Sequence, residues 1–168
     1  MAKKFLLISP KNRPTYNFRG DLLREIKNRG YEVVATGPDR ENEDKIKELG
    51  VKLIVVPLSR NGTSILSDLK YYRELKKVIK QEKPDVTLGY TIKPSIYGAL
   101  AAKSCGVKGV YSMITGAGYT FTSKTFKAKL LHKIVSFLYK KALKKADGVF
   151  FQNPDDLKMF TDDKLVKV

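Results

Sequence analysis

Residues 83–101 read KPDVTLGYTIKPSIYGALA, and this stretch decides the fold. Its first three residues interrupt a helical pattern, and the apolar run 86–88 that follows is typical of a strand buried on both faces of a parallel sheet. Polar residues come next, at 90–93. Apolar residues at helical spacing then follow: Ile96, Tyr97, Leu100 and Ala101. A strand, a polar turn and a helix in this order form one unit of an α/β fold.

The same unit recurs along the whole chain. Further short apolar runs, mostly β-branched or aromatic, stand at 5–8, 33–35, 51–56, 107–114 and 148–151. Amphipathic patterns lie between them, with one predicted helix face carrying Phe18, Leu22, Leu23 and Ile26 and another carrying Leu66, Leu69, Tyr72, Leu75 and Ile79. This alternation predicts a Rossmann-like, doubly wound parallel sheet of about six strands, with right-handed crossovers.

Helix ends are marked by glycine and asparagine. Gly30, Gly50 and Gly106 each follow a helical pattern and precede an apolar run, where a left-handed C-terminal cap is expected. Asn153, followed by Pro154 and two aspartates, predicts the start of a final helix.

Composition excludes several classes of protein. A chain of 168 residues with 42% hydrophobic residues is the size of one domain and can bury a core. One cysteine, Cys105, and one histidine, His132, rule out an intramolecular disulfide framework and a multi-histidine metal centre. No glycine stands between residues 9 and 19, so the dinucleotide-binding fingerprint is absent. We expect neither a metal nor a cofactor.

The net charge of +16 is concentrated in one block. Residues 86–146 contain eleven lysines and no acidic residue. Such a field attracts anionic partners, namely nucleic acid, anionic lipid or a phosphate-bearing substrate. General lysine enrichment of the source proteome is the alternative for the overall charge. A nucleic-acid module would need aromatic residues among exposed basic ones, whereas here they fall mainly on predicted core or rim positions. We therefore expect no specific nucleic-acid partner.

The predicted helix 126–143 has an unusually wide apolar arc, of about 220°. Four lysines occupy the remainder, with His132 at the boundary: Lys129, Lys133, Lys140 and Lys144. Two interpretations stay open and are compatible. The helix could lie in an anionic membrane interface with these lysines facing the membrane, or it could pack between the sheet and another helix or domain.

Ligands of open α/β sheets bind outside the carboxyl ends of the strands. The segments predicted there are rich in hydrogen-bonding groups and cations and poor in carboxylates, which suits a sugar or phosphate ligand and not magnesium. Glu74 and Glu82 stand eight residues apart, as paired carboxylates of retaining glycosyltransferases do, but they lie in a lysine-rich amphipathic helix. We interpret both as part of a solvated helix face.

Six segments together resemble the N-terminal domain of GT-B glycosyltransferases, most closely the family 4 enzymes of bacterial capsule, O-antigen and lipid-linked glycan assembly. They are NFRGDL at 17–22, VPLSRNG at 56–62, KPDV at 83–86, YTIKPSIYG at 90–98, ITGAGY at 114–119 and ADGVFFQN at 146–153. The resemblance runs from Phe5 to about Phe160. The chain departs from the family at the glycine pair after the first strand, which residues 10–17 replace.

The resemblance implies an enzyme of two domains, one that binds the acceptor and one that binds the donor. Residues 1–161 would be the acceptor-binding domain, one half of a GT-B fold, and residues 162–168 the start of the linker to a C-terminal Rossmann domain. That second domain would bind the nucleotide-sugar donor and supply a catalytic glutamate pair, so these 168 residues alone are expected to be inactive. The positions that the resemblance carries over as substrate-binding are Arg13, Asn17, Arg19, Tyr90, Lys93, Thr115, Gly116, Gly118 and Tyr119.

The complete enzyme implied is a retaining glycosyltransferase that moves a sugar onto a lipid-diphosphate-linked glycan. We expect it in the cytoplasm, peripherally bound to the inner face of the plasma membrane, since no targeting or membrane-spanning segment is evident. Two alternatives remain. One is a basic nucleic-acid- or anion-binding Rossmann-like module. The other is a UDP-sugar epimerase-like enzyme, for which the rim offers Asp39 as a poor general base.

Overall fold

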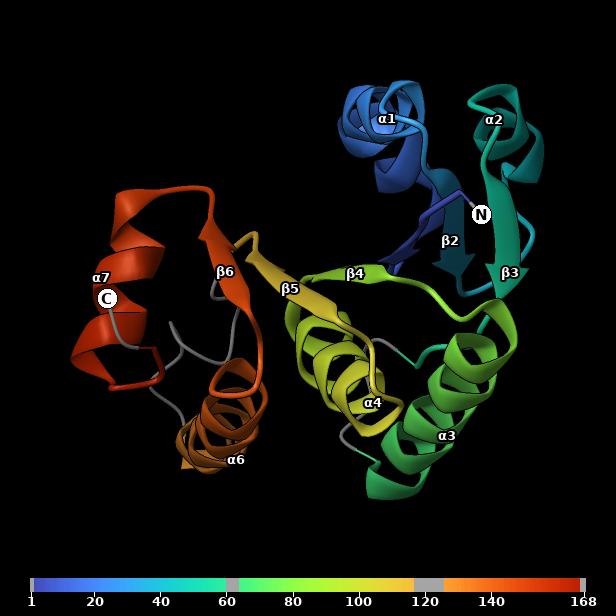
Figure 1. The fold of residues 1–168 in the computed structure, drawn as a ribbon. Helices are drawn as coiled ribbons and strands as arrows, with labels where there is room; N and C mark the ends of the chain where they lie inside the picture. The colour runs from blue at the N-terminus through green and yellow to red at the C-terminus, as the bar shows by residue number, and fades with distance from the viewer. Residues whose placement is uncertain (1, 60–63, 117–125, 167–168) are drawn as a thin grey trace.

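A computed structural model describes residues 2–59, 64–116 and 126–166, with only the backbone described at 126–130 (Figure 1). The strands are β1 (Lys4–Ile8), β2 (Glu32–Gly37), β3 (Lys52–Val55), β4 (Val86–Tyr90), β5 (Gly109–Ile114) and β6 (Gly148–Phe151). The helices are α1 (Asn12–Asn28), α2 (Glu43–Glu48), α3 (Ile65–Glu82), α4 (Ala99–Ser104), α6 (Phe126–Leu143) and α7 (Pro154–Asp162), with a π-helical turn η1 (Pro94–Gly98) before α4.

The six strands form one parallel sheet in the order β3-β2-β1-β4-β5-β6. Helices α1 and α2 lie on one face, and α3, α4 and α6 lie on the other (Figure 1). The chain starts in the middle of the sheet, builds outward to β3, and returns to build outward from β4. The direction of winding therefore reverses between β1 and β4, which is where doubly wound sheets bind ligands. The predicted fold class and strand number are confirmed.

Both faces of the central strand are buried, as expected for a parallel sheet. Leu6 and Ile8 of β1 belong to the core beneath α3, α4 and α6. Phe5 and Leu7, which alternate with them, belong to a second core that includes Leu23 of α1. The predicted caps are confirmed too: Gly30, Gly50 and Gly106 have φ of +84°, +70° and +77°. The Asn153 side chain accepts a hydrogen bond from the amide of Asp156 at 2.7 Å.

The helix stripes read from the sequence are only partly buried. Leu23 is buried, but Phe18 on the same predicted face is 73% exposed and Leu22 is exposed as well. In α3, Leu75 and Ile79 are buried, whereas Leu66 is 79% exposed. Helical periodicity therefore marks the apolar side of each helix but not which of its residues the sheet covers.

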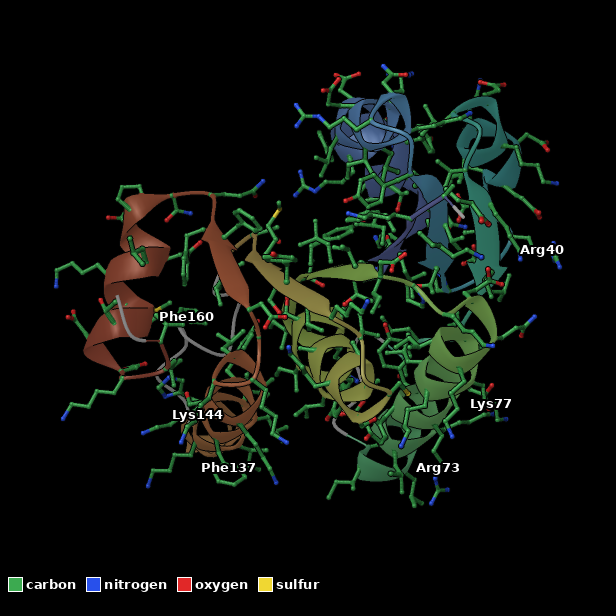
Figure 2. The ribbon with its side chains drawn as sticks, in the orientation of Figure 1. Arg40, Arg73, Lys77, Phe137, Lys144 and Phe160 are labelled. Atoms are coloured by element: carbon green, nitrogen blue, oxygen red, sulfur yellow. The ribbon has the colours of Figure 1, made fainter. Side chains whose placement is uncertain are left out.

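Helix α6 packs on the sheet through one side and leaves another side open. Tyr139 is buried and its ring meets that of Phe160 in α7 edge-on at 5.1 Å. Ile134 and Phe137 are exposed, and Figure 2 shows Phe137 pointing away from the body of the domain. The apolar arc is thus wider than the domain covers. His132 is half-buried, with its Nε2 atom 3.3 Å from the Asp163 carboxylate.

Glu82 is not on a solvated helix face, so that interpretation was wrong. Its side chain is buried at the amino end of the sheet, where it binds Lys4 of β1 at 3.0 Å and Lys52 of β3 at 2.8 Å. Glu74 pairs with Lys77 on the outer side of α3. The eight-residue spacing therefore joins two residues with unrelated structural roles.

Candidate functional site

A pocket of about 480 Å³ opens at the carboxyl ends of the strands, beside the β1–β4 reversal. Its walls come from the segments that follow four strands and from the start of α1. They consist of Pro10, Lys11, Pro14, Phe18, Arg19, Tyr90, Thr91, Thr115 and Gln152. This volume is in the range that holds a small-molecule ligand.

Buried hydroxyl groups fix the floor of the pocket. Ser9 Oγ shares hydrogen bonds with Tyr90 OH at 2.5 Å and with Thr15 Oγ1 at 2.7 Å, and Tyr90 OH lies 3.3 Å from Thr15 Oγ1. The Thr15 hydroxyl also lies 2.9 Å from the carbonyl of Lys11, to which it donates. All three hydroxyl-bearing residues are buried. The network joins the end of β1, the start of α1 and the end of β4, so the Tyr90 ring is a rigid wall.

Arg19 lies against that wall. Its guanidinium carbon is 5.2 Å from the centre of the Tyr90 ring, and one terminal nitrogen donates to the Phe18 carbonyl at 3.1 Å. Its buried Nε has no hydrogen-bond partner within the described part of the chain. A guanidinium held on an aromatic face with an N–H group to spare is suited to binding a phosphate oxygen.

The pocket lining has two chemically different sides. Lys11 and Arg19 provide cations from the β1–α1 side, whereas Thr91, Thr115 and Gln152 provide neutral polar groups from the ends of β4, β5 and β6. No lining residue is a carboxylate or a histidine. The described lining therefore offers anion binding and hydrogen bonding but no side chain suited to general base catalysis at neutral pH.

The structure brings together three of the predicted substrate-binding residues, Arg19, Tyr90 and Thr115. Gly116 directly follows Thr115 and has φ of +130°, in the region that favours glycine. Arg13 and Asn17 are exposed on α1 and are not part of the lining. Gly118 and Tyr119 lie outside the described residues.

Lys93 is also absent from the lining. Its ammonium binds the Asp68 carboxylate at 2.6 Å and the Ser59 carbonyl at 2.7 Å. The other oxygen of Asp68 accepts a hydrogen bond from Tyr97 at 2.9 Å. Burial, followed by this hydrogen bond to a carboxylate, raises the pKa of the Tyr97 hydroxyl. Lys93 thus ties the segment after β3 to the turn after β4.

Sequence reasoning did not select six of the lining residues: Pro10, Lys11, Pro14, Phe18, Thr91 and Gln152. Four of them, Pro10, Lys11, Thr91 and Gln152, stand directly after predicted strands, in the segments expected at the carboxyl ends of the sheet, so their position was the available signal. Helical periodicity places Phe18 on the predicted apolar face of α1, and in the structure its exposed side chain lines the pocket. Asp39, the carboxylate considered for an epimerase, does not line the pocket, and its Oδ1 accepts from the Asn12 amide at 3.1 Å.

Residues 4–153 match the family described as glycosyl transferase 4-like, nine-tenths of the chain. The chain belongs to this family. One relative of this chain is an enzyme of Campylobacter jejuni, 31% identical to it over 138 residues. That enzyme is the N,N'-diacetylbacillosaminyl-diphospho-undecaprenol alpha-1,3-N-acetylgalactosaminyltransferase. The match covers 82% of this chain and 37% of that enzyme, so the chain spans well under half of the relative's length.

Solved structures confirm the fold of this glycosyl transferase 4-like chain. Acinetobacter baumannii MurG has a TM-score of 0.60 at 16% identity, covering 91% of this chain and 42% of MurG. A UDP-N-acetylglucosamine 2-epimerase has a TM-score of 0.67 at 16% identity, covering 97% and 45% of the two chains. At such identities the likeness shows the fold alone. The family match, and not the fold, favours a glycosyltransferase over the epimerase and nucleic-acid alternatives.

Among the described residues, no group of three or more His, Cys, Asp or Glu is placed to hold a metal ion. Nor is any described helix both long and apolar enough to cross a membrane.

Proposed function

We propose that this chain is the acceptor-binding part of a retaining glycosyltransferase that moves a sugar from a nucleotide-sugar donor to a lipid-diphosphate-linked glycan in cell-surface polysaccharide synthesis, such as that of a capsule. The observation that carries the proposal is the pocket, where two cations meet neutral hydrogen-bonding groups with no carboxylate in the lining. A diphosphate-linked sugar has the matching chemistry. The relative's name, which specifies a diphospho-undecaprenol-linked sugar, supports the same class of acceptor.

In this proposal the chain's contribution is to position the acceptor. Arg19 and Lys11 hold the diphosphate, and the rigid Tyr90 ring limits how the ligand can lie. Fixing the acceptor hydroxyl relative to the donor lowers the entropic part of the barrier and needs no proton transfer from this domain. The donor site and the glutamate pair belong to a C-terminal Rossmann domain. We place the domain boundary near residue 161, although Leu165 is still buried in the core.

Binding of a soluble acceptor probe tests this function. Farnesyl diphosphate carrying one N-acetylglucosamine should bind the chain in isothermal titration calorimetry, and Arg19→Gln should weaken binding about tenfold, as loss of a charge-assisted hydrogen bond does. Arg73→Gln is the matched control, since Arg73 is exposed on α3, where Figure 2 shows it pointing outward. An equal loss of affinity for the probe in both variants would contradict the proposal, and so would a failure of the unsubstituted chain to bind the probe.

We also propose that the protein is cytoplasmic and binds the inner face of the plasma membrane peripherally through α6. The exposed side chains of Ile134 and Phe137 would enter the interface, and the exposed Lys133, Lys140 and Lys144 would meet anionic headgroups. Figure 2 shows Phe137 projecting from α6 and Lys144 directly after the end of this helix. Lys129 is on the same helix, and its side chain lies outside the described residues. Packing of this apolar side on another domain is the competing explanation.

Vesicle co-sedimentation distinguishes the two. The chain should bind vesicles containing phosphatidylglycerol and not pure phosphatidylcholine vesicles, and replacing Lys133, Lys140 and Lys144 with Gln should abolish binding. The charge-matched control replaces Lys27, Lys45 and Lys47, which are exposed on the α1 and α2 side of the sheet. An equal loss of vesicle binding in the control variant would mean that net charge alone, and not α6, drives binding to the membrane.

A further inference from the structure

Thr91 has an unfavourable backbone conformation for its residue type. It lies between β4 and η1 with φ of +69°, in the left-handed region. The other described non-glycine residues with positive φ are Asn42, Lys83 and Lys164, none of which is branched at Cβ. A β-branched side chain there is a genuine outlier, because its Cβ substituents crowd the backbone.

Surrounding hydrogen bonds hold Thr91 in this conformation. Its amide donates to the Met113 carbonyl at 3.3 Å, and its carbonyl accepts from the Ser95 amide at 3.0 Å. The Ser95 hydroxyl donates to the Gly89 carbonyl at 3.2 Å, and the Ser112 hydroxyl donates to the Ser95 carbonyl at 3.2 Å. The turn is fixed on both sides, so Thr91 cannot relax without breaking several of these bonds.

The conformation places Thr91 in the pocket wall, on the neutral polar side with Thr115 and Gln152. Among the residues that the structure describes, the hydrogen bonds of Thr91 are the two backbone bonds to Met113 and Ser95. A hydroxyl both donates and accepts, as sugar hydroxyls do, whereas the cations Lys11 and Arg19 across the pocket match phosphate oxygens. Strained residues that are kept in place by their surroundings are found preferentially at binding sites.

We propose that Thr91 is a sugar-binding residue, and that the two-sided pocket orients the acceptor with its diphosphate toward Lys11 and Arg19 and its sugar toward Thr91. This inference rests on the proposed function and adds to it the direction in which the acceptor lies. It also explains why a strained threonine stands at this turn, since glycine would fit the backbone but would not bind the sugar.

Thermal unfolding tests the strain. Thr91→Gly should raise the Tm by about 1–4 °C, because relief of the left-handed strain exceeds the entropy that glycine adds to the unfolded chain. Lys83→Gly is the matched control, since Lys83 has φ of +49° at the end of α3 remote from the pocket. It should raise the Tm by less than Thr91→Gly does, because Lys83 is not branched at Cβ, and it should leave binding unchanged. An unchanged or lower Tm in Thr91→Gly would overturn the strain argument.

Calorimetry with two probes tests the orientation. The first probe is farnesyl diphosphate, and the second is the same molecule bearing N-acetylglucosamine. Thr91→Gly and Thr91→Ala should weaken the second probe about tenfold, the loss expected for a hydrogen bond to a ligand, and leave the first within about twofold. Thr91→Ser, which keeps the hydroxyl, should bind both probes as the unsubstituted chain does.

The outcomes separate the inference from the proposed function. Equal weakening of both probes, or of neither, would overturn the role of Thr91 while the function stands. If the unsubstituted chain binds the two probes with equal affinity, the sugar contributes nothing to binding, and the proposed orientation of the acceptor is wrong while the function stands. If the unsubstituted chain binds neither probe, the proposed function fails, and the inference fails with it.

Discussion

Replacing Glu82 with Gln should destabilise the fold measurably, although the substitution changes a single atom. The buried carboxylate accepts charge-assisted hydrogen bonds from Lys52 at 2.8 Å and Lys4 at 3.0 Å. Bonds of this kind contribute about 1.5–3 kcal/mol each in proteins. Three facts reduce the net loss here: the glutamine carbonyl retains one bond, the Lys52 side chain is 56% exposed, and that of Lys4 is 20% exposed. We expect a cost of about 2 kcal/mol, which corresponds to a fall in Tm of about 4–8 °C for a chain of this size.

The loss of stability caused by Glu82→Gln should become smaller as the pH falls. Burial by itself raises the pKa of the Glu82 carboxyl, but the hydrogen bonds from Lys52 and Lys4 together outweigh it and hold the pKa below the ordinary value of 4.5. Because the folded pKa is below the unfolded one, the stabilisation is complete above about pH 5.5 and is lost as pH falls through and below 4.5. The difference in Tm between the unsubstituted chain and Glu82→Gln should therefore be full at pH 7 and smaller at pH 4.

Glu74→Gln is the control, on the same helix and with the same change of charge. Glu74 pairs with Lys77 at 2.7 Å in a more exposed site, so its loss should change the Tm by less than about 2 °C. Differential scanning fluorimetry of the three proteins at pH 7 and pH 4 is sufficient. Equal Tm values for the two variants at pH 7, or a Glu82→Gln deficit that does not shrink in acid, would refute the reasoning.

Three further substitutions examine the pocket floor and the core. Gly89→Ala should cost about 1–3 kcal/mol in urea unfolding, because its Cβ would lie 2.4 Å from the Pro94 carbonyl oxygen and the turn must move; an unchanged midpoint would contradict that close approach. Phe160→Leu removes two edge-on ring contacts, at 5.1 and 5.4 Å, and should lower the free energy of unfolding by about 1–3 kcal/mol. Tyr90→Phe should cost about 1–2 kcal/mol by removing the bond to Ser9, yet the retained ring should keep the affinity for farnesyl diphosphate within about twofold; a tenfold loss would mean that the hydroxyl itself contacts the ligand.

The sequence predicted well the features that local chemistry determines. Gly106 adopts the left-handed cap that its position after a helical pattern indicates, and Asn153 caps α7 as its neighbours Pro154 and Asp156 indicate. All six strands were predicted because a strand covered on both faces has few polar residues.

Features that depend on contacts between distant parts of the chain were not predictable. Phe18 and Leu66 have helical periodicity, but periodicity does not reveal which residues of a helix the sheet covers. Glu82 meets Lys4 and Lys52 across 78 and 30 residues of sequence. The strained turn at Thr91 arises from hydrogen bonds with β5, so no local signal marks it.

The strand order also has a consequence for how the protein is made. As the chain emerges from the ribosome, β2 can pair with β1, and β3 with β2, before β4 exists. β4 then joins the free side of β1, and β5 and β6 each add to the strand just made. Every new strand thus finds its partner already synthesised, and no strand must be inserted between two others. Such an order suits folding during translation, with each step shielding the edge left by the one before.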